Sequence, residues 1–283
     1  LERWERYEEM LSIMGQGRNS YSKTDTDATF MRMKEDHMRN GQLKPGYNAQ
    51  IAVNSEYITG LEVFSDRSDV KTLRPMLNTL SRWHKVRYEE VVADAGYESL
   101  ENYLYLEQNG QMCFIKPTNY DQKKTSKFRK QVGRIENMKY DPEEDCFTCV
   151  QGRNLHLRRE TTEVQNGQFV STAWYRCEDC SGCPHRTQCC RAKAPDKPKE
   201  IILKKTFWEK RELAARNIMT ERGIHLRLCR SIQVEGAFAL LKNDFGFRRF
   251  LTWGKANIRT ELFLLALAFD LKKLWMKREQ GRF

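Results

Sequence analysis

The stretch YEEVVADAGYES, residues 88–99, is the starting point for predicting the fold. Its β-branched and apolar residues favour a short strand, which ends on Asp94 and is followed by Gly96. Asp94 is either a turn former or a carboxylate at the rim of a sheet, where α/β proteins bind ligands. In the second case, Gly96 is expected to let the backbone turn sharply beneath the site.

The flanking sequence predicts an α/β fold with a mixed sheet. Apolar residues at helical spacing indicate helices over residues 68–84 and 99–110. Three strands, a helix, a strand, a helix and a strand are typical of a sheet covered by helices. Besides the strand that ends on Asp94, we expect strands at residues 24–33, 47–53, 57–64 and 111–117.

Composition shifts divide the chain into four parts. Between residues 118 and 205 the charge rises, helical periodicity disappears and most of the nine cysteines occur. We interpret this part as an inserted subdomain that is too polar to build its own core. The chain begins on Leu1 inside a helix-like pattern, so we expect it to continue upstream. The predicted parts are an N-terminal helix and linker (1–23), the first part of the core (24–117), a cysteine-rich insertion (118–205) and the helical remainder of the core (206–283).

The charge balance favours a polyanionic partner. Lys and Arg number 49 against 38 Asp and Glu, which gives a net charge of +11 and a pI near 9.2. The longest apolar run, at residues 262–269, is too short to cross a bilayer. The charged N-terminus lacks the apolar middle of a signal peptide. Cysteines at C-x-x-C spacing without a secretory signal indicate a reducing compartment and metal binding rather than disulfides.

Three acids are the candidate catalytic residues. Asp94 ends its strand, Asp27 opens the strand predicted at 24–33, and Glu235 lies on an amphipathic helix within residues 230–246. If the two strands are sheet neighbours, their carboxylates converge at one rim. Two-metal phosphodiester cleavage needs several hard oxygen ligands around two Mg²⁺ ions about 4 Å apart. Lys242, two helical turns after Glu235, would share its face and contact a DNA phosphate.

Four segments in order, TDTDATFMRMK, GYNAQIAV, ADAGYES and RSIQVEGAFALLKNDFGFRRF, resemble bacterial insertion-sequence transposases of the DDE type. The resemblance spans residues 21–274 and includes the cysteine-bearing insertion before the Glu helix. It implies an RNase H-like fold, in which a five-stranded mixed sheet is flanked by helices. It also implies metal-dependent hydrolysis and strand transfer at transposon ends, with two Mg²⁺ ions for which Mn²⁺ can substitute. The implied partners are double-stranded DNA of the ends and target and a second copy in the DNA complex, with no membrane, in the bacterial cytoplasm at the nucleoid.

The resemblance assigns the first acid to Asp27, with Asp25 as the alternative, and the other two to Asp94 and Glu235. In the related Y-x2-R-x3-E-x6-K signature, Lys242 matches the lysine. Leu228 and Ser231 occupy the tyrosine and arginine positions, so the phosphate-binding arginine is in doubt. The candidate DNA contacts are Arg230 (one residue before the arginine position), Lys242, Tyr97 and Arg248.

The cysteines predict a structural zinc site. DCFTC and RCEDCSGC supply C-x2-C pairs separated by 27 residues, which is zinc-ribbon spacing. The preferred set is Cys146 and Cys149 with two of Cys177, Cys180 and Cys183, while Cys189 is a possible substitute. The alternative is a set of unligated thiols.

Two other functions fit the sequence. One is a non-catalytic, zinc-containing DNA-binding remnant of a transposase, favoured by the incomplete signature. The other is a nuclease of the same fold that hydrolyses DNA without joining it. DNA cleavage that depends on Mg²⁺ separates the transposase from the remnant, and strand joining separates it from the nuclease.

Overall fold

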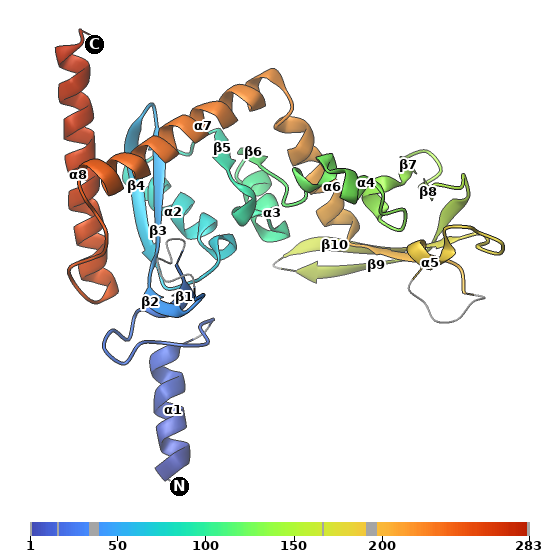
Figure 1. Ribbon diagram of the computed structural model, residues 1–283, viewed down its shortest axis with the longest axis horizontal. Coiled ribbons are helices and arrows are strands. Elements are labelled where there is room, and N and C mark those ends of the chain that lie inside the picture. Colours follow the sequence, from blue (N-terminus) through green and yellow to red (C-terminus); the bar gives the residue numbers. More distant parts are fainter. Residues whose placement is uncertain (1, 16, 34–39, 166, 191–196, 282–283) are drawn as a thin grey trace.

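The computed structural model describes residues 2–15, 17–33, 40–165, 167–190 and 197–281. The chain is elongated (Figure 1): a sheet of strands β7–β11 lies at one end, helix α8 (Lys255–Glu279) lies at the other, and helix α1 (Glu2–Met14) projects from the strands β1 and β2. Between these ends lies a layer of strands and helices that contains Asp94. The protein is therefore of mixed α/β class, as predicted.

The strands predicted before residue 118 all form, but they pair two by two. Over the described ranges, β1 pairs with β2, β3 with β4, and β5 with β6, and these pairs are not hydrogen-bonded into one sheet. Only the β5–β6 pair is parallel. The predicted mixed five-stranded sheet is therefore not present as a continuous sheet. The strands are β1 Thr29–Arg32, β2 Leu43–Gly46, β3 Asn48–Asn54, β4 Tyr57–Phe64, β5 Glu90–Ala93 and β6 Met112–Ile115.

The first strand finds a partner that the sequence did not predict. Thr29 lies opposite Gly46 and Arg32 opposite Leu43 in an antiparallel ladder. Strand β2 has the sequence LKPG, and Pro and Gly are poor strand formers that occur at sheet edges. The expectation that β1 neighbours the strand ending at Asp94 was wrong, because this local partner pairs with β1 instead.

Helices cover both faces of the β3–β4 hairpin. On one face, Leu80 and other residues of α2 (Leu73–His84) pack with Ala52 and with α3 (Leu100–Gln108). On the other face, Leu61 and Val63 pack against Ile258, Leu262 and neighbouring residues of α8 (Lys255–Glu279). The alternation of side chains along a strand explains why one hairpin can serve two helical layers.

The cysteine-rich part folds around a core of its own. Its five strands form an antiparallel sheet in the order β11-β10-β9-β8-β7. Phe147, Leu155 and Tyr175 are at most 1% exposed, and Trp208 of α6 packs against them. The prediction that this part is too polar for a core was therefore wrong. The elements are α4 Ser126–Arg129, β7 Lys139–Asp141, β8 Cys146–Thr148, β9 Asn154–Gln165, β10 Gln168–Cys177, α5 Arg186–Cys189, β11 Glu200–Leu203 and α6 Lys205–Asn217.

A partly buried carboxylate connects this sheet to α6. Asp145 accepts hydrogen bonds from Tyr140 (2.8 Å), Tyr175 (2.7 Å) and the ammonium of Lys205 (2.9 Å). Burial alone would raise the pKa of Asp145, but these bonds hold it below its ordinary value. The charged form of Asp145 therefore stabilises the junction.

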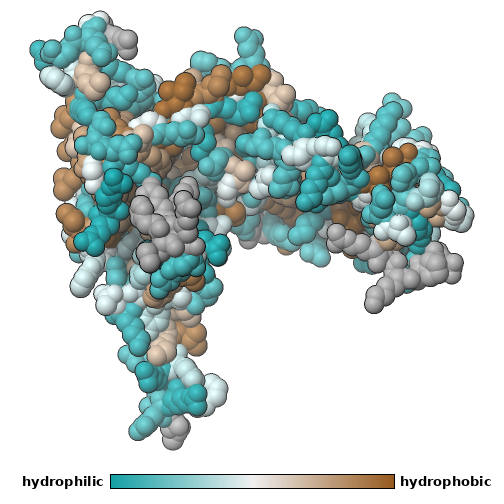
Figure 2. All heavy atoms as spheres, viewed as in Figure 1, coloured by the Kyte–Doolittle hydropathy of each residue, from teal (hydrophilic) through white to brown (hydrophobic). Residues whose placement is uncertain are grey.

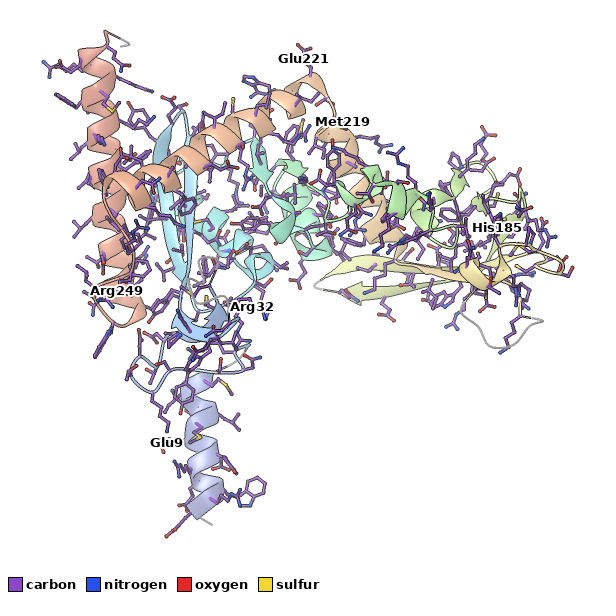
Figure 3. All side chains as sticks on the ribbon, viewed as in Figure 1. Glu9, Arg32, His185, Met219, Glu221 and Arg249 are labelled. Carbon is purple, nitrogen blue, oxygen red and sulfur yellow. The ribbon has the colours of Figure 1, made fainter. Side chains whose placement is uncertain are left out.

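The helical part predicted from residue 206 onward does not begin with one continuous helix. It breaks between Met219 and Glu221 (Figure 3), where Thr220 caps the second helix, α7 (Glu221–Ala239), by accepting a hydrogen bond from Gly223 N at 3.0 Å. A π-helical turn, Leu240–Asp244, follows α7. Helix α7 lies across β3 and β5, so it spans the region next to Asp94.

Helix α7 is less completely buried than its apolar pattern predicts. Ala237 and Leu241 are buried, whereas Ile232 is 72% exposed. Figure 2 shows apolar surface along this helix, to which Ile224 and Leu228 contribute. None of the helices in the described ranges has the length and hydropathy of a membrane span.

Candidate active site

Asp94 lies one residue beyond the carboxyl end of β5, at the rim predicted from the sequence. Its backbone is extended, and its side chain accepts a hydrogen bond from Gly96 N at 3.1 Å, which starts a short 3₁₀ turn. The carboxylate is thus a helix cap, yet 46% of the side chain stays exposed. The residue is both a turn former and an accessible carboxylate.

Arg230 of α7 binds the other oxygen of this carboxylate. Its guanidinium donates to Asp94 Oδ2 at 2.8 Å across 136 positions of the chain. Both side chains are partly exposed, at 29% and 46%. Such a pair contributes at most about 1 kcal/mol to stability, so its main effect is to place a fixed positive charge beside the acid.

A second carboxylate, which sequence reasoning missed, lies beside Asp94. Asp69 accepts hydrogen bonds from the side-chain amides of Asn48 (2.8 Å) and Gln50 (3.0 Å) on β3. A Cβ added to Gly96 would lie 2.9 Å from Asp69 Oδ2 and 3.3 Å from Asp94 Oδ1. Gly96 therefore allows the two acids to approach each other closely. This close approach, in addition to the turn expected from the sequence, explains a glycine at this position. The missed signal was the position of Asp69, shortly after a buried strand.

Tyr97 packs into the core below the rim. Its hydroxyl donates to Gln50 Oε1, the residue whose amide also holds Asp69. Burial, and then the nearby Asp69 and Asp94, raise the pKa of Tyr97 far above its ordinary value. The side chain is a neutral hydrogen-bond donor that positions Gln50.

The first predicted acid and its alternative both lie at the start of α8. Lys255 N donates to Asp27 Oδ2 at 2.9 Å, and Gly254 N donates to Asp25 Oδ2 at 3.3 Å. Tyr47 also donates to both oxygens of Asp25 at 2.8 Å. Carboxylates at a helix N-terminus satisfy free N–H groups and oppose the helix dipole. Both acids therefore stabilise the start of a 25-residue helix.

The third predicted acid, Glu235, is exposed on α7 and accepts a hydrogen bond from Ser231 at 3.0 Å. It follows Arg230 by five residues, so it stands about 140° around the helix from the side chain that contacts Asp94. Lys242 lies within the π-helical turn, a feature that often marks functional positions in helices. Arg248, beyond this turn, is exposed.

The predicted zinc ligands divide into two groups. Cys146 is buried in β8 and takes no part in the wall of the cavity that the other candidates line. Across the ranges that the structure describes, no three His, Cys, Asp or Glu side chains stand ready as a metal site, whether among the thiols or among the acids. The cysteines that share the cavity wall are Cys149, Cys177, Cys180, Cys183 and Cys189, together with Cys190.

Part of the chain matches a known protein family. Residues 148–275 match the family model described as transposase DDE domain. This part of the chain is similar to a transposase DDE domain. The match confirms the resemblance to DDE-type insertion-sequence transposases, and that family implies DNA as substrate. No curated protein and no solved structure matches the chain.

The DDE domain match covers a little under half of the chain. It includes Glu235, the contact residue Arg230 and all the cysteines that line the cavity. Asp94 and Asp27 lie before residue 148, outside the matched part. Of the three predicted acids, Glu235 alone lies inside the matched part.

Proposed function

We propose that this chain catalyses metal-dependent phosphodiester hydrolysis and strand transfer at the ends of an insertion sequence. The observation that carries the proposal is the rim beyond β5. There, the half-exposed carboxylate of Asp94 lies beside Asp69 and is bound by Arg230 of the DDE domain. Exposed carboxylates next to a cationic side chain suit a reaction on a phosphate diester.

The two carboxylates at the rim supply part of the ligand set that a magnesium site needs. Asp94 and Asp69 are hard oxygen donors of the kind that Mg²⁺ prefers. Two bound Mg²⁺ ions, or Mn²⁺ in their place, would supply an activated nucleophile and stabilise the leaving oxygen. Asp27 and Glu235 remain the proposed first and third acids. Their recruitment requires release of Asp27 from the start of α8 and rotation of Glu235 toward the rim.

Arg230 has a defined task in this proposal. Its guanidinium forms an ion pair with Asp94. When DNA binds, its guanidinium can turn to a phosphate oxygen, for which its fork geometry is suited. Asp94 would then be free to act as a metal ligand. Lys242 and Arg248 are proposed as further phosphate contacts.

A basic cavity close to Asp69 supports DNA as the partner. It measures about 400 Å³, and Arg18, Arg67 and Lys71 contribute to its wall. Thr29 also lines it with a buried hydroxyl that has no hydrogen-bond partner among the described residues. A phosphate group in this cavity would be bound by the three cations. Together with the net charge of +11, this cavity favours a DNA strand that runs past the rim.

We also propose an oligomeric state and a cellular location for this activity. Joining two transposon ends to one target needs two active sites, so we propose a homodimer in the DNA complex. We propose that the chain acts on bacterial DNA in the cytoplasm, at the nucleoid.

Incubation with DNA and divalent metal tests the activity and its alternatives. The transposase is expected to nick plasmid DNA only with Mg²⁺ or Mn²⁺ and to join a labelled 3′ end to that plasmid. Nicking without joining would identify a nuclease, and binding without nicking in either metal would identify a non-catalytic remnant.

A further inference from the structure

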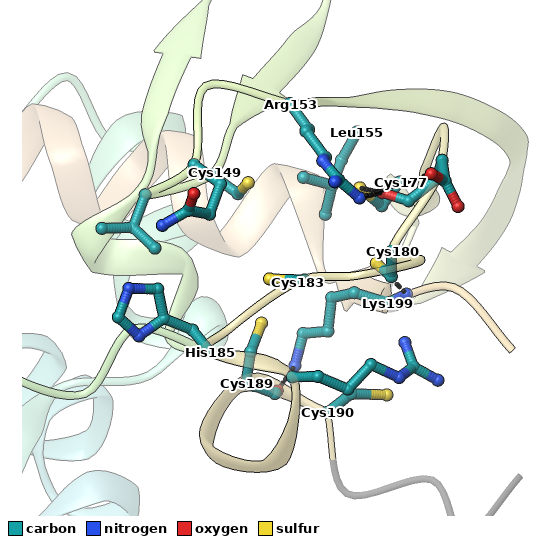
Figure 4. A pocket seen from close by; sticks show the side chains of 14 residues that line it. Cys149, Arg153, Leu155, Cys177, Cys180, Cys183, His185, Cys189, Cys190 and Lys199 are labelled. Atoms are coloured by element: carbon teal, nitrogen blue, oxygen red, sulfur yellow. Dashed lines mark hydrogen bonds and ion pairs between the residues drawn. The ribbon is translucent and has the colours of Figure 1, made fainter. Parts of the chain in front are cut away.

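One end of the cysteine-rich part holds a small cavity surrounded by thiols. Six cysteines line it, and its volume is about 20 Å³. This space suits a single ion or water molecule and excludes an organic ligand. Figure 4 shows the sulfur atoms of Cys149, Cys183 and Cys189 around this space, with that of Cys180 across from them.

Two tight turns deliver three of these thiols. After β8, Gly152 N donates to Cys149 O at 2.9 Å, and Gly152 has a positive φ of 74°. In the second turn, Cys183 N donates to Cys180 O at 3.4 Å, and Gly182 has a φ of 61°. Cysteines on tight, glycine-containing turns resemble the knuckles of zinc ribbons, where the backbone bends so that thiolates reach one metal.

A third segment brings the fourth thiol. Cys189 ends α5, and its carbonyl accepts a hydrogen bond from Lys199 Nζ at 2.9 Å. The backbone N–H of Lys199 donates to Cys180 Sγ at 3.3 Å. Lys199 thus connects the segments that carry Cys180 and Cys189, and its N–H group can stabilise a metal-bound thiolate.

Basic groups surround the cavity. Arg153 binds the carbonyls of Asp179 (2.8 Å) and Ser181 (3.0 Å), which connects the two turns. Arg153, Arg186 and Lys199 all line the cavity. Four thiolates around one Zn²⁺ carry a net charge of −2, and these three cations would compensate it.

From this geometry we infer that Cys149, Cys180, Cys183 and Cys189 bind one structural Zn²⁺. This set replaces Cys146, the first preference of the sequence pattern, with Cys189. All four thiols line the same cavity of about 20 Å³. Since no three thiols in the described ranges are already arranged around a metal, side-chain rotation toward the cavity centre accompanies binding.

The remaining thiols have other positions. Cys177 is 2% exposed and donates its S–H to Asp179 O at 3.2 Å. Cys190 lines the cavity, but its sulfur is directed away from those of Cys183 and Cys189 (Figure 4). Cys146 lies in a different environment, within reach of the carboxylates of Asp141 and Asp145. These three are the natural controls for the ligand set.

Zinc content of the purified chain tests the site without any DNA assay. Metal analysis by mass spectrometry should find about one zinc per chain. Each serine substitution of Cys149, Cys180, Cys183 or Cys189 should lower the zinc content at least about tenfold when a competing chelator is present. The matched variant Cys190→Ser should retain its zinc. A wild-type chain without zinc after purification and reconstitution with ZnCl₂, or a Cys190→Ser variant that loses it, would overturn the inference.

Thiol protection in the wild-type chain removes the risk that a variant fails to fold. Alkylation with and without Zn²⁺, followed by peptide mapping, should show zinc-dependent protection of the four proposed ligands, while Cys190 and Cys229 react equally in both states. Protection of Cys146 in place of Cys189 would refute the set. Because neither readout involves DNA cleavage, failure of the zinc site and failure of the proposed transposase activity are separate outcomes.

Discussion

Glu98 offers a quantitative test of how the core is joined to the cysteine-rich part. Its side chain is 1% exposed, and its carboxylate receives two bonds from Arg211 of α6, at 2.7 and 3.0 Å. Thr118, at the start of the cysteine-rich part, donates its N–H at 2.8 Å and its hydroxyl at 2.7 Å. Tyr103 donates a further bond at 2.8 Å. One carboxylate therefore connects three segments.

The substitution Glu98→Gln should destabilise the chain strongly. The substitution removes the negative charge of the Glu98 carboxylate. It also places an amide NH₂ group among hydrogen-bond donors, so Arg211 loses its ion-pair partner. Breaking a buried ion pair from one side costs about 3–5 kcal/mol. Because Arg211 is 20% exposed, we expect about 3 kcal/mol, measured as the free energy of unfolding in urea.

Glu107→Gln is the matched control. Glu107 of α3 also pairs with a residue of α6, Lys210, but it is 54% exposed. Exposed pairs contribute at most about 1 kcal/mol. If Glu98→Gln costs no more than Glu107→Gln, the argument that Glu98 joins the two parts is refuted.

The difference in stability between wild type and Glu98→Gln is predicted to depend on pH. Burial raises the pKa of Glu98, but the bonds from Arg211 and Thr118 outweigh it and hold the pKa below its ordinary value. A lowered pKa means that the stabilisation is complete above the unfolded pKa, about 4.3, and is lost as the pH falls through the folded pKa. The stability gap between wild type and Glu98→Gln should therefore be constant near neutral pH and shrink below about pH 4.

Three further predictions follow from single contacts. Gly96→Ala should lower the melting temperature and separate Asp69 from the rim, because the added Cβ would lie 2.9 Å from its Oδ2; a melting curve identical to wild type would contradict the close approach. Asp145→Asn should destabilise the cysteine-rich part by about 1–3 kcal/mol through loss of the bond from the Lys205 ammonium. Because the folded pKa of Asp145 is lowered, this difference in urea stability should be constant near neutral pH and should shrink as the pH falls below about 3.8. Burial raises the pKa of Cys113 to about 11, so native protein should alkylate there far more slowly than unfolded protein; equal rates would show an accessible thiol.

Local sequence patterns predicted the elements well but not their partners. The strand before Asp94 and the helix that carries Glu235 follow from β-branched residues and helical spacing. The contact between Arg230 and Asp94 spans 136 positions, and no local pattern encodes it. Asp27 illustrates the limit: its place before a strand was visible, whereas its hydrogen bond to Lys255 at the start of α8 depends on tertiary packing.

The cysteine-rich part was misjudged for a related reason. Its core depends on a few large residues, such as Phe147, Tyr175 and Trp208, separated by charged positions on exposed strand faces. The average composition of residues 118–205 reflects the high charge of this part. It does not reveal that apolar and charged side chains alternate along the strands, which buries one face of the sheet. The zinc ligand set shows the same effect, because spacing favoured Cys146, which lies in a strand away from the cavity wall.

The central claim is that Asp94 is a metal-binding carboxylate of a DNA-cleaving site. The measurement that tests it most directly is the rate of plasmid nicking in Mn²⁺ by wild type, Asp94→Asn and the exposed-acid control Glu163→Gln. Loss of several kcal/mol of metal-dependent stabilisation should slow Asp94→Asn at least about a hundredfold, while Glu163→Gln keeps the wild-type rate. Nicking by folded Asp94→Asn at the rate of Glu163→Gln would contradict the account.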